Sequence, residues 1–143
     1  MKIIFGLFLF AFSFILIDCS SSSTSQKDGE YDTITLPSGL KYQDIRIGTG
    51  KIAEFGKKVT INYTWKTEDG TIVEDTYKSG QPFNFTIGAE NILQGMNEGI
   101  VNMKEGGKRR LFIPSELGYG NRNVRNIPSN SNLIIDVELL KVQ

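Results

Sequence analysis

The sequence contains no histidine and only one cysteine, and these two shortages exclude several kinds of chemistry. Histidine is the commonest general base and metal ligand, and it partners serine or cysteine in most nucleophilic pairs. The single cysteine, Cys19, cannot form a disulfide within the chain. The sequence therefore predicts a protein that works without a side-chain nucleophile, a metal ion or another cofactor.

An excess of charge of one sign is missing as well. The chain of 143 residues has 16 lysines and arginines against 16 acidic residues, so its formal net charge is zero. This balance provides no electrostatic basis for binding nucleic acid. We therefore interpret Lys108-Arg109-Arg110 as ordinary solvent-facing charges of a strand rather than as a basic patch. The length predicts one modest domain with additional segments.

The N-terminal region combines a short positive start with the one long hydrophobic run, residues 3–17. This run is short for a membrane-spanning helix and fits the core of a signal peptide. The sequence Leu16-Ile17-Asp18-Cys19 resembles a bacterial lipobox, in which the cysteine becomes the lipidated first residue of the mature protein. An ordinary secretory signal or a short anchor is the alternative. We expect residues 1–18 to be a lipoprotein signal peptide.

The segment after Cys19 is polar and contains an unbroken run of serine and threonine, residues 20–25. It has no apolar side chain to bury, so residues 19–30 are predicted to form a lipidated cysteine and a flexible tether. The folded domain is predicted over residues 31–143. Lipidation would hold the protein in the cell envelope, at a bacterial membrane, with the domain in the periplasm or on the surface. In enteric bacteria an aspartate directly after the lipidated cysteine retains a lipoprotein in the inner membrane. Ser20 stands at that position here, so we expect the outer membrane.

The remaining sequence reads mostly as short strands separated by turns. In the strand predicted over residues 59–66, Val59, Ile61, Tyr63 and Trp65 alternate with polar residues, and a period of two indicates one buried face. Glu68-Asp69-Gly70 predicts a hairpin turn. The stretches predicted as strands are residues 33–36, 40–47, 59–66, 71–77, 83–87, 108–113 and 133–141.

A single helix is predicted over residues 91–100, capped near Asn91. Ile92, Met96 and Ile100 recur every four residues and share one helical face. We interpret this face as partly core and partly the floor of a binding pocket, with the Tyr119 loop (residues 114–120) as a wall. Strands without βαβ alternation around one helix predict an α+β domain, a curved antiparallel sheet folded over one short central helix.

Many short fragments, each weak as a signal alone, occur in one order along residues 36–142. They are Tyr63-Thr64, Glu68-Asp69-Gly70-Thr71, Gln81-Pro82-Phe83-Asn84-Phe85, Ile87-Gly88, Gly95-Met96-Asn97-Glu98-Gly99, Met103, Gly106-Gly107, Ile113-Pro114, Tyr119-Gly120, Ile127-Pro128 and Asp136-Val137-Glu138-Leu139-Leu140. Together they resemble the FKBP-type peptidyl-prolyl cis–trans isomerases, the immunophilins that bind macrolide immunosuppressants. The resemblance implies a five- or six-stranded antiparallel half-barrel around one short helix. The lead-in, residues 36–42, is similar to that of bacterial secreted members.

The resemblance also implies a site for the proline ring of a polypeptide. Its catalytic positions fall on Tyr63, Glu74, Phe83 and Tyr119. Its other substrate-binding positions fall on Val73, Phe85, Ile92, Met96, Ile127 and Ile135. The main-chain N–H of Ile92 and the hydroxyl of Tyr119 are implied as donors to substrate carbonyls, and the aromatic rings as a cradle for the proline.

Four of these positions differ from the usual family residues. Met96 stands where tryptophan is common, Val73 and Ile135 where phenylalanine is usual, and Glu74 where aspartate is usual. These differences imply a less aromatic and wider pocket, with reduced affinity for macrolides. The expected activity is isomerisation of X-Pro bonds in exported proteins by a monomer. The alternatives are a weakly active or inactive proline-binding, chaperone-like module and a surface lipoprotein that contacts a partner.

Overall fold

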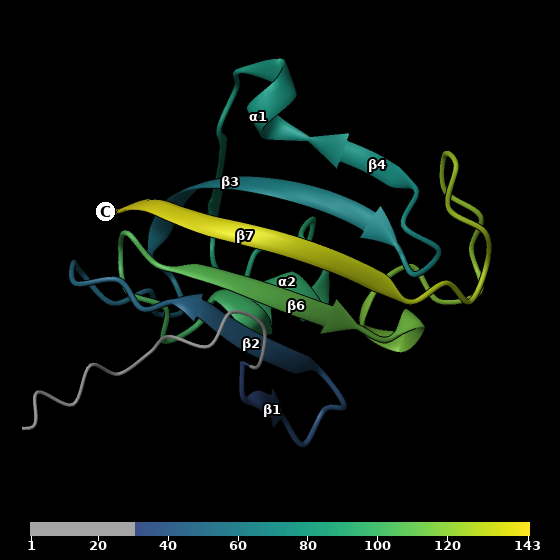
Figure 1. Ribbon diagram of the computed structural model, residues 1–143, viewed down its shortest axis with the longest axis horizontal. Coiled ribbons are helices and arrows are strands. Elements are labelled where there is room, and N and C mark those ends of the chain that lie inside the picture. Colours follow the sequence, from purple (N-terminus) through teal and green to yellow (C-terminus); the bar gives the residue numbers. More distant parts are fainter. Residues whose placement is uncertain (1–30) are drawn as a thin grey trace, which may run out of the picture.

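The computed structural model describes residues 31–143, which form one antiparallel sheet with short helices (Figure 1). The strands are β1 (Thr33–Thr35), β2 (Lys41–Arg46), β3 (Lys58–Thr67), β4 (Ile72–Asp75), β5 (Phe83–Thr86), β6 (Lys108–Ile113) and β7 (Leu133–Val142). The helices are α1 (Thr76–Ser79), α2 (Gln94–Ile100) and the 3₁₀ turn η1 (Ser115–Leu117). The predicted signal peptide, Cys19 and tether lie outside the described residues.

The sheet has the order β1-β2-β6-β7-β3-β4, and β5 pairs with β3 beside this path. Every strand pair is antiparallel. The two ten-residue strands, β3 and β7, pair along almost their whole length at the centre. The sheet bends over α2, which lies behind β6 and β7 in Figure 1. The predicted α+β architecture is therefore confirmed, with seven strands where the resemblance implied five or six.

The hydrophobic core lies between the sheet and α2. The inward face of β3 carries its buried residues at every second position, as the alternation predicted. The inward faces of β6 and β7 do the same with Leu111, Ile113, Leu133, Ile135 and Val137. Among the described residues, 31–143, the buried hydrophobic side chains form one cluster.

One predicted strand, residues 71–77, is interrupted in the structure. Strand β4 ends at Asp75, and the chain turns into the single-turn helix α1. The Asp75 carboxylate accepts hydrogen bonds from the main-chain N–H groups of Tyr77 and Lys78, at 3.0 and 3.3 Å. Aspartate is a strong helix N-cap because it satisfies these otherwise unpaired donors. The prediction of a continuous strand was wrong because it did not recognise this cap.

Helix α2 begins at Gln94, three residues after the predicted start at Asn91, and no side chain caps it. Its two glycines let it approach the sheet closely. A Cβ on Gly95 would lie 2.5 Å from a methyl of Ile113, and one on Gly99 would lie 2.6 Å from Leu111. Glycine weakens a helix, so its presence twice in seven residues reflects this close packing rather than helix propensity.

The expectation that Arg109 faces solvent was wrong. Its side chain is buried and makes two hydrogen bonds to the carboxylate of Asp44, at 2.6 and 3.1 Å. It also donates to the carbonyls of Gly99 and Val101 at the end of α2, at 2.8 and 3.3 Å. The guanidinium lies 4.0 Å from the centre of the Tyr42 ring. Arg109 thus joins β2, β6 and the C-terminal end of α2.

Among residues 31–143, no helix is long and apolar enough to cross a membrane.

Candidate functional site

Three aromatic side chains from β3 and β5 form the first part of the site. Tyr63 meets Phe83 edge to face, with ring centres 6.0 Å apart, and Phe83 stacks on Phe85 at 5.5 Å. Strand pairing brings them together, because Phe83 is the register partner of Ile61, two residues before Tyr63. The main-chain N–H of Tyr63 donates to the buried hydroxyl of Thr76 at 2.8 Å. The structure therefore assembles three of the predicted site residues into one rigid cluster.

A second aromatic pair continues the site along β3. Trp65 stacks on Tyr119, with ring centres 5.6 Å apart and planes only 15° from parallel. Trp65 shares the buried face of β3 with Tyr63. The sequence analysis placed Trp65 on this face but assigned it no role in the site. The alternation itself was the signal that could have identified it.

The predicted residues separate into a buried base and a half-buried rim. Met96, Ile127 and Ile135 are almost wholly buried in the core. Val73, Phe83, Ile92 and Tyr119 pack on that core and keep part of their surface exposed. The short side chains of Val73 and Ile135 do not leave this face open, because Trp65 lies directly opposite Ile135 in the strand register. The expected loss of aromatic character is therefore offset by Trp65.

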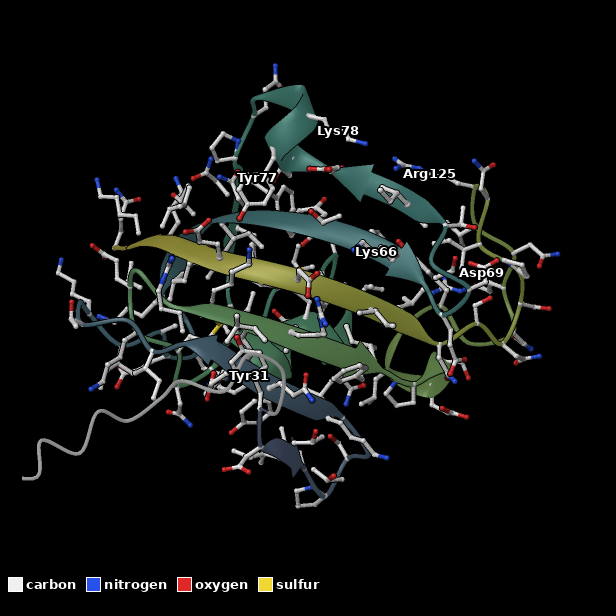
Figure 2. The ribbon with its side chains drawn as sticks, in the orientation of Figure 1. Tyr31, Lys66, Asp69, Tyr77, Lys78 and Arg125 are labelled. Carbon is white, nitrogen blue, oxygen red and sulfur yellow. The ribbon has the colours of Figure 1, made fainter. Side chains whose placement is uncertain are left out.

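Glu74 lies at the edge of the site and forms an ion pair with Arg125, at 3.4 Å. Arg125 comes from the loop between η1 and β7, which reaches the end of β4 (Figure 2). Burial raises the pKa of the Tyr63 hydroxyl well above its usual value, and the neighbouring Glu74 carboxylate raises it further. Burial also raises the pKa of Tyr119. Both phenols therefore stay protonated, as hydrogen-bond donors, at neutral pH.

The donor that the resemblance implied at Ile92 is already engaged. The main-chain N–H of Ile92 donates to the carbonyl of Ala89 at 3.2 Å. Within residues 31–143, the next N–H, that of Leu93, has no hydrogen-bond acceptor. Asn97 holds this segment, because its side chain accepts from the N–H of Gly88 at 2.8 Å and donates to Ala89. The structure therefore moves the available donor from Ile92 to Leu93, which sequence reasoning missed.

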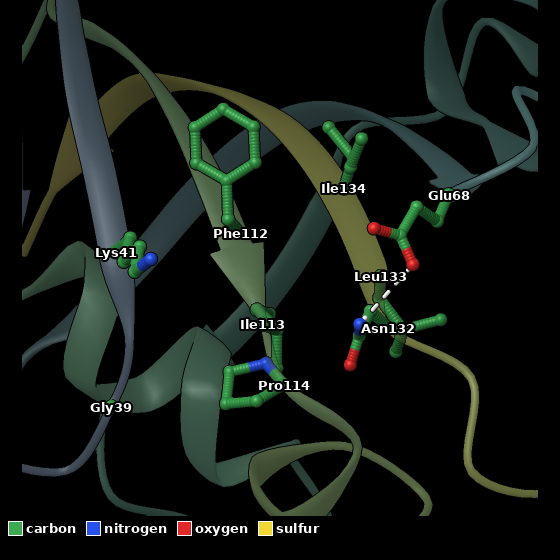
Figure 3. Close-up of a pocket in the computed structure, with 9 residues that line it drawn as sticks. All are labelled: Gly39, Lys41, Glu68, Phe112, Ile113, Pro114, Asn132, Leu133 and Ile134. Carbon is green, nitrogen blue, oxygen red and sulfur yellow. Dashed lines mark hydrogen bonds between the residues drawn. The ribbon is translucent and has the colours of Figure 1, made fainter.

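A separate hollow of about 270 Å³ lies on the outer side of the sheet, where β2, β6 and β7 run side by side (Figure 3). Asn132 donates a hydrogen bond to Glu68 across it, at 3.1 Å. None of the predicted site residues lines this hollow. Its lining residues are Gly39, Lys41, Glu68, Phe112, Ile113, Pro114, Asn132, Leu133 and Ile134.

The fold and the site together define a class of protein: an antiparallel sheet bent over one packed helix, with an aromatic binding surface between strand β3 and the Tyr119 loop. A family model described as FKBP-type peptidyl-prolyl cis-trans isomerase matches residues 49–140. The chain therefore belongs to the FKBP-type peptidyl-prolyl cis–trans isomerase family. The family and the class of enzyme that the ordered fragments predicted are thereby confirmed.

Curated relatives and solved structures agree with this assignment. The FK506-binding protein of Neisseria meningitidis serogroup B is 45% identical over 105 residues, which cover 73% of this chain and 96% of the relative. FK506-binding protein 4 of Dictyostelium discoideum is 43% identical over 108 residues, which cover 75% of this chain but 29% of the relative. The crystal structure of FkpA from Escherichia coli superimposes with a TM-score of 0.73 at 37% identity, covering 82% of this chain and 53% of FkpA. The chain thus spans less than a third of the Dictyostelium relative and nearly all of the Neisseria relative.

Proposed function

We propose that this protein accelerates the cis–trans isomerisation of X-Pro bonds in exported polypeptides at the site between β3, α2 and the Tyr119 loop. The observation that carries the proposal is the meeting of Tyr63, Phe83 and Phe85 with the Trp65–Tyr119 pair on one face of β3. The Neisseria and Dictyostelium relatives are named for binding FK506. FK506-type macrolides are therefore proposed as competing ligands of the same site.

The chemistry needs no bond to form between protein and substrate. Rotation about an X-Pro bond meets a barrier of roughly 18–20 kcal/mol that arises from amide resonance. The planar amide is more polar than the twisted transition state, so an apolar site that excludes water favours the twisted state. Tyr119 and the N–H of Leu93 supply donors for carbonyl oxygens of the peptide. This agrees with a chain that lacks histidine.

The direct test is NMR exchange spectroscopy on a Leu-Pro peptide with the segment of residues 26–143. We expect the cis–trans exchange rate to rise in proportion to enzyme concentration, far above the uncatalysed process, which takes tens to hundreds of seconds. An excess of FK506 should abolish the added exchange. A well-folded segment that binds the peptide without any rate increase would contradict the enzyme and support the proline-binding module.

We further propose that Cys19 anchors the protein in a bacterial envelope membrane and that residues 20–30 act as the tether. The supporting pattern is a positive start, an apolar run, and Leu16 at the third position before the only cysteine. A single acyl chain binds membranes only marginally, so stable anchoring needs more than one chain. The anchor would keep the isomerase beside newly exported proteins.

Replacing Cys19 by serine tests the anchor. We expect the wild type to fractionate with bacterial membranes and the C19S variant to move to the soluble fraction or to remain unprocessed, because serine cannot carry the thioether-linked lipid. A Ser20→Ala variant is the control and should stay with the membranes. Equal membrane association of C19S and wild type, with normal processing, would refute lipid anchoring.

A further inference from the structure

Trp65 is the single tryptophan of the chain. Only 7% of its surface is exposed, and its indole N–H has no hydrogen-bond partner within residues 31–143. Buried donors in folded proteins are nearly always paired, because an unpaired one loses its hydration without compensation. The Trp65 N–H is therefore a donor that a bound molecule can satisfy.

Three observations place this donor at the isomerase site. Trp65 follows Tyr63 by two residues on the same face of β3, a spacing of about 7 Å along a strand. Its register partners on the neighbouring strands are Glu74 and Ile135, both predicted site positions. Its ring stacks on that of Tyr119. Trp65 thus connects the Tyr63 cluster to the Tyr119 loop.

We propose that Trp65 acts in the isomerase site in two ways: it sets the plane of the Tyr119 ring, and its indole N–H is a third donor to a carbonyl of the bound peptide, beside the Tyr119 hydroxyl and the Leu93 N–H. This inference rests on the proposed isomerase function and deepens it.

The physical reason for the positioning role is the local structure around Tyr119. Tyr119 is half-buried, and the main chain on either side of it is held by hydrogen bonds from the N–H groups of Gly118 and Gly120 to the carbonyl of Ser115, at 3.0 and 2.8 Å. These bonds fix the position of the loop, and stacking on the buried indole fixes the plane of the Tyr119 ring. The half-buried Tyr119 ring lies against the buried indole, so a peptide that binds at Tyr119 comes next to the Trp65 side chain.

The first test uses the fluorescence of this single tryptophan in the segment of residues 26–143. A Leu-Pro tetrapeptide without tyrosine or tryptophan is added until cis–trans exchange is saturated. We expect a saturable change in emission whose midpoint equals the KM for that peptide. Emission that stays constant up to saturation would overturn the proposal, and this measurement requires no variant.

The second test compares two replacements of Trp65. W65F keeps a ring for stacking but loses the N–H, and W65L loses both. We expect kcat/KM to fall about threefold in W65F and about tenfold in W65L. Wild-type kcat/KM in W65L, with its fold checked by circular dichroism, would overturn the proposal.

A double-mutant cycle separates positioning from a general structural effect. If Trp65 acts through Tyr119, the fold-decrease in kcat/KM of the double variant W65L/Tyr119→Phe should be smaller than the product of the fold-decreases of the two single variants. Effects that multiply fully would overturn the positioning role. Failure of the proposed function looks different: the wild type would then give no rate increase at all, whereas failure of this inference leaves the wild-type rate and the Tyr119→Phe effect unchanged.

Discussion

Replacing Arg109 by alanine is expected to lower the free energy of unfolding by about 3–5 kcal/mol, the usual result of removing one partner of a buried ion pair. The Arg109 side chain is 7% exposed, and it satisfies both the Asp44 carboxylate and two carbonyls at the end of α2. Its removal leaves these acceptors without their donor. For a domain of this size, the Tm should fall by roughly 15 °C or more.

The neighbouring residue provides a matched control. Arg110 binds the carboxylate of Asp136 with the same two distances, 2.6 and 3.1 Å, but its side chain is 41% exposed. Water reaches and screens this guanidinium, and Asp136, although only 15% exposed, keeps Lys66 at 3.9 Å, so Arg110→Ala should cost about 1 kcal/mol, well below the cost of Arg109→Ala. Arg109→Lys should recover little of the stability, because an ammonium group cannot reproduce the planar, branched set of hydrogen bonds. Urea unfolding of the three variants measures the difference, and equal destabilisation at 109 and 110 would contradict the role of burial.

Phe83→Ala is expected to lower kcat/KM roughly thirtyfold, which corresponds to about 2 kcal/mol, the free energy of burying the phenyl ring against the bound proline. Phe83 touches both Tyr63 and Phe85, and it keeps part of its surface exposed at the rim. Tyr119→Phe removes only the hydroxyl donor, and it should lower kcat/KM about tenfold with the Trp65 stack intact. Exchange spectroscopy on the Leu-Pro peptide measures both effects.

Phe112 is the matched control for Phe83. It is also half-buried, but it lies on β6 beside the hollow on the outer side of the sheet. Phe112→Ala should lower stability by an amount similar to Phe83→Ala while leaving kcat/KM unchanged. Full activity in both Phe83→Ala and Tyr119→Phe would show that the substrate binds elsewhere. An equal fall in activity in Phe83→Ala and Phe112→Ala would show that the effects arise from stability alone.

Local patterns in the sequence were sufficient for the architecture. The period-two alternation of Val59, Ile61 and Tyr63 depends only on the geometry of a strand with one buried face, so it identified β3 and its inward side. The limits of β6, residues 108–113, were also predicted correctly. The ordered fragments identified the family because a hundred residues of shared spacing carry far more information than any single motif.

The tertiary structure determined which residues distant in sequence contact one another. The sequence analysis expected Arg109 to face solvent, and only the fold brings the end of α2 and Asp44 to it and makes a buried arginine stable. Local pattern likewise assigned Trp65 to a buried face, but the stack on Tyr119 joins residues 54 positions apart.

The free N–H donor at Leu93 also could not be predicted from local sequence patterns. Which of two adjacent N–H groups is free depends on the turn that Ala89 and Asn97 impose before α2. Propensity and periodicity describe what a segment prefers by itself. Burial, pairing and the unpaired donors of a site depend on contacts distant in sequence, and these exist only once the chain has folded.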